Sequence, residues 1–419
     1  MTLLLLLPTF FIMFLGTPLF VVIAGLALFL LFTNQIDSSA MIIDIYRIAT
    51  TPIFVAIPLF TFSGYLLSES RTPQRLFRFS NALLGWLPGG LAIITLVVCA
   101  VFTALTGATG LTIIAMGGIL YPALLQGKYP ERFSIGLVTN SGTLGLLFPP
   151  SLPLIIYAIV AKVQINDLFL AGLLPGLLLV ILLSLFSIRK AVASEVPRPK
   201  FNWTELFQSF KSGFWELPLP IVILGGIYSG YFAISEAAAM TAVYVLFVEV
   251  VIYRDIKWRE LPKIMRKSMI LVGGILIILG AALGLTNYLI DEDVPAKLMI
   301  YFQGHISSPI VFLILLNLFL LIVGCMMDIF SALIVVVPII TPLALAYGIH
   351  PVHLGIIFLT NLQIGASTPP VGMNLFISSI RFDKPILKLI QASVSFIAIL
   401  LLGLAIITYV PSLSLLLLK

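Results

Sequence analysis

Two membrane-length apolar segments of this chain are interrupted by the same polar, proline-containing pattern. Residues 139–150 read TNSGTLGLLFPP, and residues 360–370 read TNLQIGASTPP. In each, Thr-Asn precedes a glycine, Gly145 or Gly365, and Pro-Pro begins four residues after that glycine. Unwound backbone at membrane depth is tolerated only where protein buries it or where it lines a polar cavity. A helix break that recurs about half a chain length later therefore indicates a transport site.

Composition places the chain in the membrane. It has 419 residues, of which 60% are hydrophobic and 10% charged, whereas a soluble domain is roughly 25% charged. Apolar runs of about 20 residues recur throughout, which predicts an all-α polytopic membrane protein. A β-barrel would instead show short strands of alternating polarity. The net charge of +6 is explained by orientation in the bilayer, so we expect no nucleic-acid partner.

The order of segments predicts two repeats. The first repeat spans residues 1–190 with a re-entrant hairpin at 90–125, and the second spans 217–419 with a hairpin at 310–346. A polar linker, 191–216, separates them. Each repeat is expected to hold about five crossings besides its hairpin. Residues 1–32 lack the basic start of a secretory signal and are expected to form two retained spans.

Loop charges predict that the two halves are inverted. The segment 69–78 carries three arginines, whereas its counterpart 291–295 is acidic. Conversely, 34–44 has no basic residue, whereas its counterpart, the loop 254–267, has six. Because Lys and Arg favour the cytoplasmic side, the basic segments are assigned to the cytoplasm and both termini to the outside. Glu249, near a cytoplasmic end, is expected to reach the interface.

Each hairpin turn carries polar groups suited to a transport site. The first turn holds Thr103, Thr106, Thr109 and Thr112, and the second holds Asp328. A carboxylate at membrane depth normally has a partner or a purpose, and no Lys or Arg lies nearby in sequence. The alternatives are threonines bonded back to their own helix and an Asp328 that caps the returning helix. No phosphate loop, nucleophile elbow or zinc motif occurs, so we do not expect an enzyme.

Several motifs resemble one known family, the large membrane (M) subunit of tripartite ATP-independent periplasmic (TRAP) transporters. They are the Gly-x-x-x-Pro-Pro-Ser sequence at 145–151, Ser-Glu-Ala-Ala-Ala at 235–239, Asp-x-x-Ser-Ala at 328–332 and Thr-Pro-Pro-Val-Gly-Met-Asn at 368–374. The resemblance covers essentially the whole chain. In the first hairpin, threonines stand where serines are commoner in the family.

This resemblance implies a sodium-driven, elevator-type carrier in the bacterial inner membrane. Its partners would be a small membrane (Q) subunit as a separate chain and a periplasmic substrate-binding protein. The substrate would be an organic acid such as a C4-dicarboxylate or sialic acid. The family's roles map onto a first Na+ site of Thr103, Thr106, Asn140, Gly145 and Pro149, a second Na+ site of Asp328, Ser331, Gly365, Thr368 and Pro370, and substrate contacts at Thr109, Ser141 and Asn374.

Other functions remain open from sequence alone. A self-sufficient Na+- or H+-coupled carboxylate carrier would use the same hairpins without a binding protein. A non-transporting membrane scaffold would not need polar residues at both broken helices. Proton or sodium coupling and the identity of the substrate are also undecided.

Overall fold

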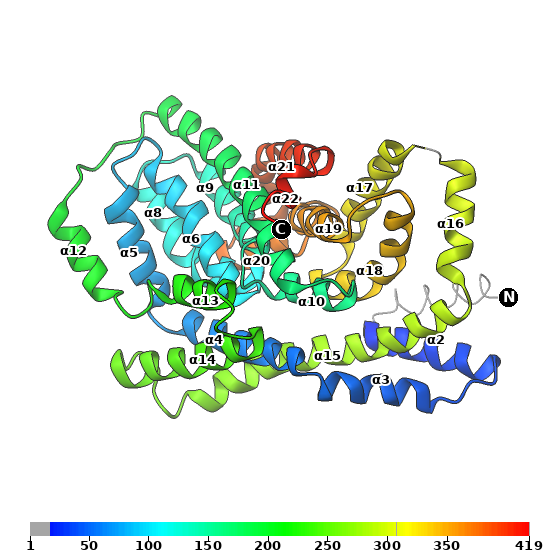
Figure 1. Ribbon diagram of the computed structural model, residues 1–419. Coiled ribbons are helices and arrows are strands. Elements are labelled where there is room, and N and C mark those ends of the chain that lie inside the picture. Colours follow the sequence, from blue (N-terminus) through cyan, green and yellow to red (C-terminus); the bar gives the residue numbers. More distant parts are fainter. Residues whose placement is uncertain (1–16, 307, 419) are drawn as a thin grey trace.

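The computed structural model describes residues 17–306 and 308–418, and every regular element in this part of the chain is a helix (Figure 1). The elements of the first half are α2 (Leu19–Thr33), α3 (Ser39–Thr50), η1 (Pro52–Val55), α4 (Ala56–Glu69), α5 (Thr72–Leu84), α6 (Gly90–Thr106), α7 (Thr109–Ala115), α8 (Gly117–Gln126), α9 (Glu131–Ser141), η2 (Leu144–Leu147), α10 (Leu152–Val160) and α11 (Ile165–Ala193). The linker and second half contain α12 (Trp203–Ser212), α13 (Leu219–Tyr228), α14 (Ile234–Phe247), η3 (Val248–Ile252), α15 (Leu261–Asp291), α16 (Val294–His305), α17 (Pro309–Met326), α18 (Ile329–Ala346), α19 (Pro351–Gly365), α20 (Met373–Phe382), α21 (Ile386–Tyr409) and α22 (Ser412–Leu415).

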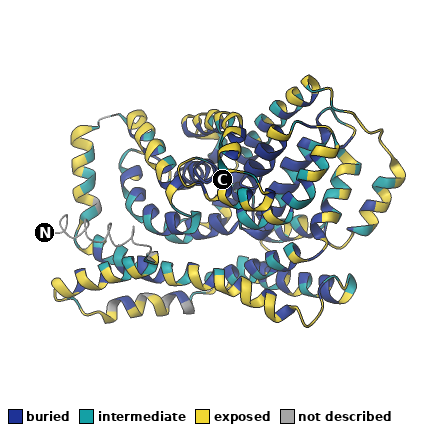
Figure 2. Cartoon of the chain, turned by 180° about the vertical axis from the view of Figure 1, so that it is seen from behind, coloured by how far each residue is buried: buried dark blue, intermediate teal, exposed yellow. Residues whose placement is uncertain are grey.

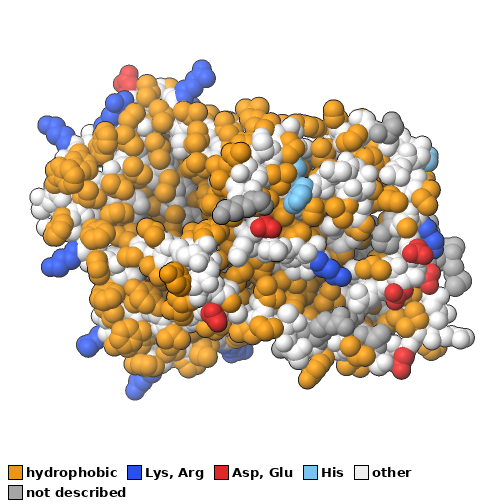
Figure 3. All heavy atoms as spheres, in the orientation of Figure 1, with side chains coloured by type: hydrophobic (Ala, Val, Ile, Leu, Met, Phe, Trp, Pro, Cys, Tyr) orange, Lys and Arg blue, Asp and Glu red, His pale blue; other side chains and the backbone are white. Residues whose placement is uncertain are grey.

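The helices have the length and polarity of a multi-pass membrane protein. Within the described residues, seven are long and apolar enough to cross a bilayer, or up to nine if two sharply bent pairs each count as one span. Figure 3 shows a broad apolar surface, with Lys and Arg mainly at the end where α5 and α12 lie and several acidic side chains at the α16 end.

Two groups of helices make up the molecule. In the first group, α2, α3 and α4 pack along the long helix α15, and α14 packs against α4 (Figure 1). In the second, α19 is almost entirely buried at the centre and packs against α10, α11, α17, α18 and α21, and α6 to α9 and α20 join the group through these helices and one another (Figure 2). The helices α5 and α16 lie at opposite ends of the molecule, each between the two groups (Figure 1).

Two pairs of helical arms turn back near the middle of the fold. We refer to α6 with α7 and α8 as hairpin 1, and to α17 with α18 as hairpin 2. Hairpin 1 turns at Gly107, whose φ of +68° is left-handed, and a methyl group there would lie 2.6 Å from the Leu152 side chain. Only glycine satisfies both conditions without strain.

The returning arm of the hairpin expected at 90–125 is not a single straight helix. It is bent by 49° between α7 and α8, on either side of Met116. Gly117 and Gly118 follow the bend, and their missing side chains admit Phe382 and Arg381 of α20. The bend therefore fits the close approach of a distant helix, which the local apolar pattern does not reveal.

Two further expectations need correction. The basic segment 254–267 is not all loop, because α15 begins at Leu261 and takes Lys263, Arg266 and Lys267 into its first turns. Glu249 does not reach the surface, since it is fully buried in the π-helix η3. The first span expected near the N-terminus lies outside the described residues.

Candidate functional site

A cavity of about 370 Å³ lies between the turns of the two hairpins. Its walls are residues 107–111 of hairpin 1, residues 327–330 of hairpin 2, Tyr65 of α4, Leu271 of α15, and Ala366 and Met373 beside the second break. This volume suits a small organic molecule. Among the residues that the structure describes, Asp328 is the one charged residue that lines the cavity, and none of the lining residues is Lys, Arg or His.

The first break packs directly on the first arm of hairpin 1. A methyl group on Gly145 would lie 2.3 Å from the Ala100 carbonyl oxygen and 2.5 Å from the Thr103 Cβ atom. The Thr103 hydroxyl lies 2.6 Å from the Thr112 hydroxyl and 2.8 Å from the Gly142 carbonyl oxygen. Thr103 thus joins both arms of the hairpin to the broken helix.

The other residues predicted for the first ion site face different surroundings. The Thr106 hydroxyl is buried without a hydrogen-bond partner in the described structure, beneath Gly64 of α4. The Asn140 amide donates to the Gly136 carbonyl at 2.7 Å and to the Ser393 hydroxyl of α21 at 3.1 Å. Pro149 lines a separate apolar cavity of about 280 Å³. The structure therefore brings Thr103 and Gly145 together but turns the Asn140 amide nitrogen towards α21.

The second break likewise packs directly on the first arm of hairpin 2. A methyl group on Gly365 would lie 2.5 Å from the Gly324 carbonyl carbon and 2.9 Å from the Cys325 nitrogen. After the break, the Gly372 amide donates to the Cys325 carbonyl at 3.1 Å. Both Pro-Pro bonds, 149–150 and 369–370, are cis. In each half, the glycine of the break therefore contacts the first arm of the hairpin.

Asp328 caps the returning helix of hairpin 2, as one of the sequence interpretations expects. Its Oδ2 accepts from the Ser331 amide at 3.0 Å, and its Oδ1 accepts from the Ser331 hydroxyl. The Thr368 hydroxyl donates to the Ile364 carbonyl at 2.7 Å. Asp328 is only partly buried and lines the cavity, so its carboxylate remains accessible to a ligand.

Two of the three predicted substrate residues lie together. The Thr109 hydroxyl donates to the Asn374 Oδ1 at 3.0 Å, and this bond joins the two halves of the chain. The Asn374 amide in turn lies 3.5 Å from the Ser367 hydroxyl. Thr109 lines the cavity and Asn374 is buried behind it. Ser141 does not line the cavity; its hydroxyl bonds the Val138 carbonyl of its own helix.

Sequence patterns did not identify several residues of the site. Ser367 adjoins the predicted Thr368, and its hydroxyl is a signal that could have been used. Tyr65 and Leu271 form cavity walls from helices far away in the sequence. An aromatic and an aliphatic residue in apolar helices give no local sign of that position.

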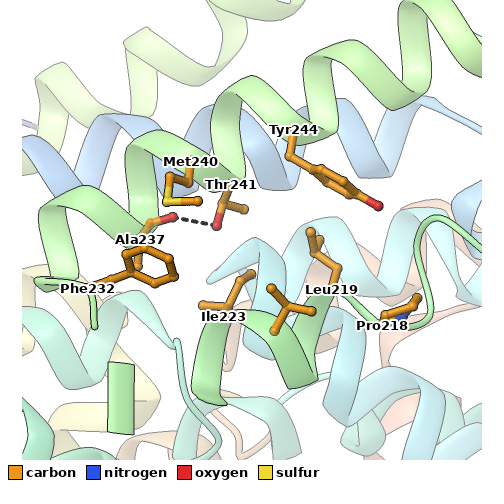
Figure 4. Close-up of a pocket in the computed structure, with 9 residues that line it drawn as sticks. Pro218, Leu219, Ile223, Phe232, Ala237, Met240, Thr241 and Tyr244 are labelled. Atoms are coloured by element: carbon orange, nitrogen blue, oxygen red, sulfur yellow. Dashed lines mark hydrogen bonds between the residues drawn. The ribbon is translucent and has the colours of Figure 1, made fainter. Parts of the chain in front are cut away.

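A second cavity, of about 130 Å³, lies between α13 and α14 (Figure 4). Its walls are almost wholly apolar, with Leu219 and Ile223 facing Phe232 and Met240. The Thr241 hydroxyl is already bonded to the Ala237 carbonyl at 2.6 Å. With no free polar group to orient a polar solute, this cavity is a poor candidate for a transport site.

The most buried charges lie outside both cavities, around Arg75 of α5. The Arg75 Nε is 2.9 Å from Glu216, its Nη2 is 3.3 Å from Glu249 and its Nη1 is 2.7 Å from Asp255. Burial lowers the pKa of Arg75, but the hydrogen bonds and charges of these carboxylates raise it overall. We call these four residues the Arg75 cluster. It fixes α5 to the segment that contains η3 and the end of the linker.

Comparison with known proteins identifies the family. A family model described as "Tripartite ATP-independent periplasmic transporter, DctM component" matches residues 6–413. The chain belongs to this family. The match confirms the resemblance seen in the sequence motifs and makes the chain a TRAP transporter large permease.

Similar proteins support the same assignment. The chain is 37% identical over 394 residues to the C4-dicarboxylate TRAP transporter large permease protein DctM of Pseudomonas aeruginosa, covering 94% of this chain and 92% of that protein. It is 33% identical to the sialic acid TRAP transporter large permease protein SiaM of Vibrio cholerae, covering 87% and 85%. The isethionate TRAP transporter permease protein DctMQ of Oleidesulfovibrio alaskensis is 32% identical, and the match covers 95% of this chain but 63% of that protein.

Among solved structures, the fold is similar to the YdaH transporter of Alcanivorax borkumensis, with a TM-score of 0.58 at 15% identity. The match covers 88% of this chain and 86% of that one. At this identity the likeness concerns the fold alone.

Proposed function

We propose that this TRAP large permease imports an organic acid through the cavity between the hairpin turns, driven by Na+. The observation that carries the proposal is the position of Asp328, whose carboxylate lines the cavity beside no cationic side chain. An anionic substrate next to Asp328 would be repelled unless a cation bound there first. A coupling ion at Asp328 removes that repulsion and makes substrate binding depend on the ion.

The ion sites are proposed at the two contacts between a break and a hairpin. The first site consists of Thr103, Thr106 and Gly145, together with Asn140 and Pro149, which are close to Gly145 in sequence. The second site consists of Asp328, Ser331, Gly365, Thr368 and Pro370. Carbonyl and hydroxyl oxygens at unwound helices are typical sodium ligands in transporters. Supporting this, Thr103 lies in the hairpin arm that Gly145 contacts, and Asp328 lies in the turn just after Gly324 and Cys325, which Gly365 contacts. Substrate would contact Thr109 with Asn374 behind it.

The transport movement is proposed to be of the elevator type, in two inverted repeats. The helices around α15 would remain fixed, and the group around α19 would move with the cavity. Consistent with inversion, α5 and α16 follow equivalent segments of the two halves and lie at opposite ends of the molecule (Figure 1). By the charge pattern, the α5 end faces the cytoplasm of a bacterial inner membrane and both termini face the periplasm.

The substrate class rests on the relatives, whose names give a C4-dicarboxylate, sialic acid and isethionate. All are small organic anions, and the cavity is large enough for such molecules. Because none of the described residues that line the cavity is basic, recognition of the substrate would depend on hydroxyls, backbone amides and the bound cation.

We propose two partners, a periplasmic binding protein and a small membrane subunit on a separate chain. The DctMQ relative, of which this chain covers only part, suggests that the small subunit is fused in some members.

The test replaces Asp328 with asparagine. Asn caps a helix about as well as Asp, so Asp328→Asn keeps the bond from Ser331 but removes the charge. The chain, its small subunit and the cognate binding protein are reconstituted in proteoliposomes, and uptake is measured with and without a Na+ gradient. We expect uptake by Asp328→Asn to lose its Na+ dependence, with a fall of about tenfold or more.

Asp291→Asn, at an exposed helix end, is the matched control and should retain wild-type uptake. Unchanged Na+ dependence in Asp328→Asn and Thr368→Ala would contradict the proposed ion site. Uptake without any binding protein would favour the self-sufficient carrier instead.

A further inference from the structure

The linker helix α12 presents a row of aromatic side chains, two of which are largely exposed. Trp203, Phe207 and Phe210 recur at helical spacing and are 75%, 71% and 40% exposed, and Phe214, just beyond the end of the helix, is 47% exposed. The opposite side of the helix carries the buried Ser209 and packs against α5. An exposed aromatic row of this size marks an interaction surface.

The segment around α12 also carries unpaired positive charge. Arg189, Lys190, Arg198, Lys200 and Lys211 are all exposed, and none forms an ion pair within the described part of the chain. Glu205, the one acid of α12, is already paired with Arg78 at 2.7 Å. Lys200 and Lys211 flank the two most exposed aromatic residues. The surface is thus apolar and aromatic at its centre and cationic at its edges.

The position of α12 in the chain keeps it near the bilayer. The segment begins where α11, a candidate span, ends with Arg189 and Lys190 in its last turns, and it leads into the apolar helix α13. With 10 residues, α12 itself is about 15 Å long, too short to cross a hydrocarbon core of about 30 Å. A short helix with an aromatic face and basic edges lies along the membrane surface.

We propose that the aromatic face of α12, with its flanking basic residues, is a binding surface for anionic phospholipids of the adjoining leaflet. Trp203 and Phe207 enter the boundary between headgroups and acyl chains, and the five cations contact lipid phosphates. Charge complementarity selects an anionic lipid surface as the occupant. Neutral lipid would satisfy the aromatic row but leave the cations without partners.

This surface is connected to the helices that contact the transport site. Arg78 and Phe79 of α5 contact Glu205 and Phe210 of α12, with the two rings 6.1 Å apart. The α5 helix also packs against α6, the first arm of hairpin 1. Lipid that holds α12 at the membrane therefore also restrains α5.

Quenching of Trp203 fluorescence tests the proposal. The full chain carries four tryptophans, so Trp86→Phe, Trp215→Phe and Trp258→Phe leave Trp203 as the only one. This protein is placed in phosphatidylcholine nanodiscs containing either brominated phosphatidylglycerol or brominated phosphatidylcholine at equal mole fraction. We expect the anionic lipid to quench Trp203 about threefold or more strongly than the neutral one.

Variants that remove basic residues distinguish selection of an anionic headgroup from insertion of Trp203 into any lipid. In the triple variant Arg198→Gln, Lys200→Gln and Lys211→Gln, both lipids should quench Trp203 equally. The matched control is Lys257→Gln, Arg259→Gln and Lys263→Gln, which removes three exposed charges elsewhere and should keep the preference. Elution of each variant as a single species in size-exclusion chromatography verifies folding.

Two results would overturn the proposal. Equal quenching by both lipids in the protein with all five basic residues would show that no anionic lipid is selected. Quenching by neither lipid, or loss of quenching when the small membrane subunit is added, would show that the aromatic row faces water or protein. Neither readout involves transport, so the outcome is independent of the proposed function.

Discussion

Gly145 and Gly365 have no room for even one additional methyl group. The neighbouring atoms that a methyl group would meet first are backbone atoms of α6 and α17, at 2.3 Å and 2.5 Å. Backbone atoms of a packed helix cannot rotate aside as a flexible side chain can. The glycines therefore set the distance between each broken helix and its hairpin.

Gly145→Ala and Gly365→Ala should each lower the free energy of unfolding by about 1–3 kcal/mol through overpacking. Denaturant titration of the purified protein in detergent, followed by circular dichroism, measures the change. Gly225→Ala is the control, because no atom lies within 4 Å of the added methyl group. If all three variants had the same free energy of unfolding, close packing at the breaks would not contribute to the stability of the protein.

At the residue scale, the sequence predicts which polar groups occur at the site better than it predicts which atoms those groups contact. Asp328 as a helix cap and Thr103 near the first break follow from short motifs, because both depend on neighbours close in the chain or on a repeated pattern. The direction of the Asn140 side chain does not follow, since the partner that decides it is Ser393 on α21. The family resemblance implies a substrate contact at Ser141, but the Ser141 hydroxyl bonds within its own helix.

At the scale of helices, the Arg75 cluster is the firmest connection between α5 and the rest of the fold. Arg75 is 13% exposed, and Glu216 and Glu249 are 3% and 0% exposed. One guanidinium thus faces three carboxylates, and the Arg75 side chain also lies 3.9 Å from the centre of the Tyr253 ring. Removal of the single cation would leave buried carboxylates unpaired.

Arg75→Ala should therefore destabilise the protein by about 3–5 kcal/mol. Arg78→Ala is the control on the same helix, because its side chain is 49% exposed and its ion-pair partner, Glu205, lies outside the cluster, and it should cost about 1 kcal/mol or less. Adding Glu216→Gln to Arg75→Ala removes one unpaired carboxylate and should restore part of the loss. Unfolding titrations in detergent compare all three, and equal stability of the two arginine variants would contradict the role of the cluster.

Helix positions follow well from the sequence, whereas bends do not. The long apolar run near the C-terminus forms α21 at Ile386–Tyr409, because such a run bounded by polar residues has one low-energy structure in lipid. The bend at Met116 depends on α20, which approaches across Gly117 and Gly118. The start of α15 was misplaced because basic residues were assigned to a loop, although Lys and Arg are good helix formers.

At the scale of the whole molecule, the charge pattern assigns the two ends to opposite sides of the membrane. Gln74 lies in the basic segment 69–78, and Lys297 lies in α16 just after the acidic counterpart 291–295. Both side chains are exposed. If the halves are inverted, these equivalent ends must face different compartments.

Cysteine labelling measures this orientation. In a background with Cys99→Ala and Cys325→Ala, a membrane-impermeant maleimide should label Lys297→Cys in intact cells. It should label Gln74→Cys only after the membrane is permeabilised. Labelling of both positions in intact cells would contradict the inverted arrangement, and the reverse pattern would contradict the assignment of sides.

The cavity shows what local patterns omit at this scale. Its turns and its carboxylate come from the two hairpins that the sequence predicts, but its remaining walls include Tyr65 of α4 and Leu271 of α15. These residues belong to the helices proposed to stay fixed. Their position depends on how the two groups of helices meet, and no short motif encodes that contact.

The two Pro-Pro breaks have similar backbones but differ in how far they are exposed. Pro149 and Pro150 are buried, whereas Pro369, Pro370 and the neighbouring Val371 are exposed in the isolated chain. If the elevator moves the group around α19 against α15, the surroundings of the exposed break change with every cycle. An antibody fragment raised against residues 369–371 would therefore bind one stage of the cycle in preference to others, and it would serve as both an inhibitor and a reporter of conformation.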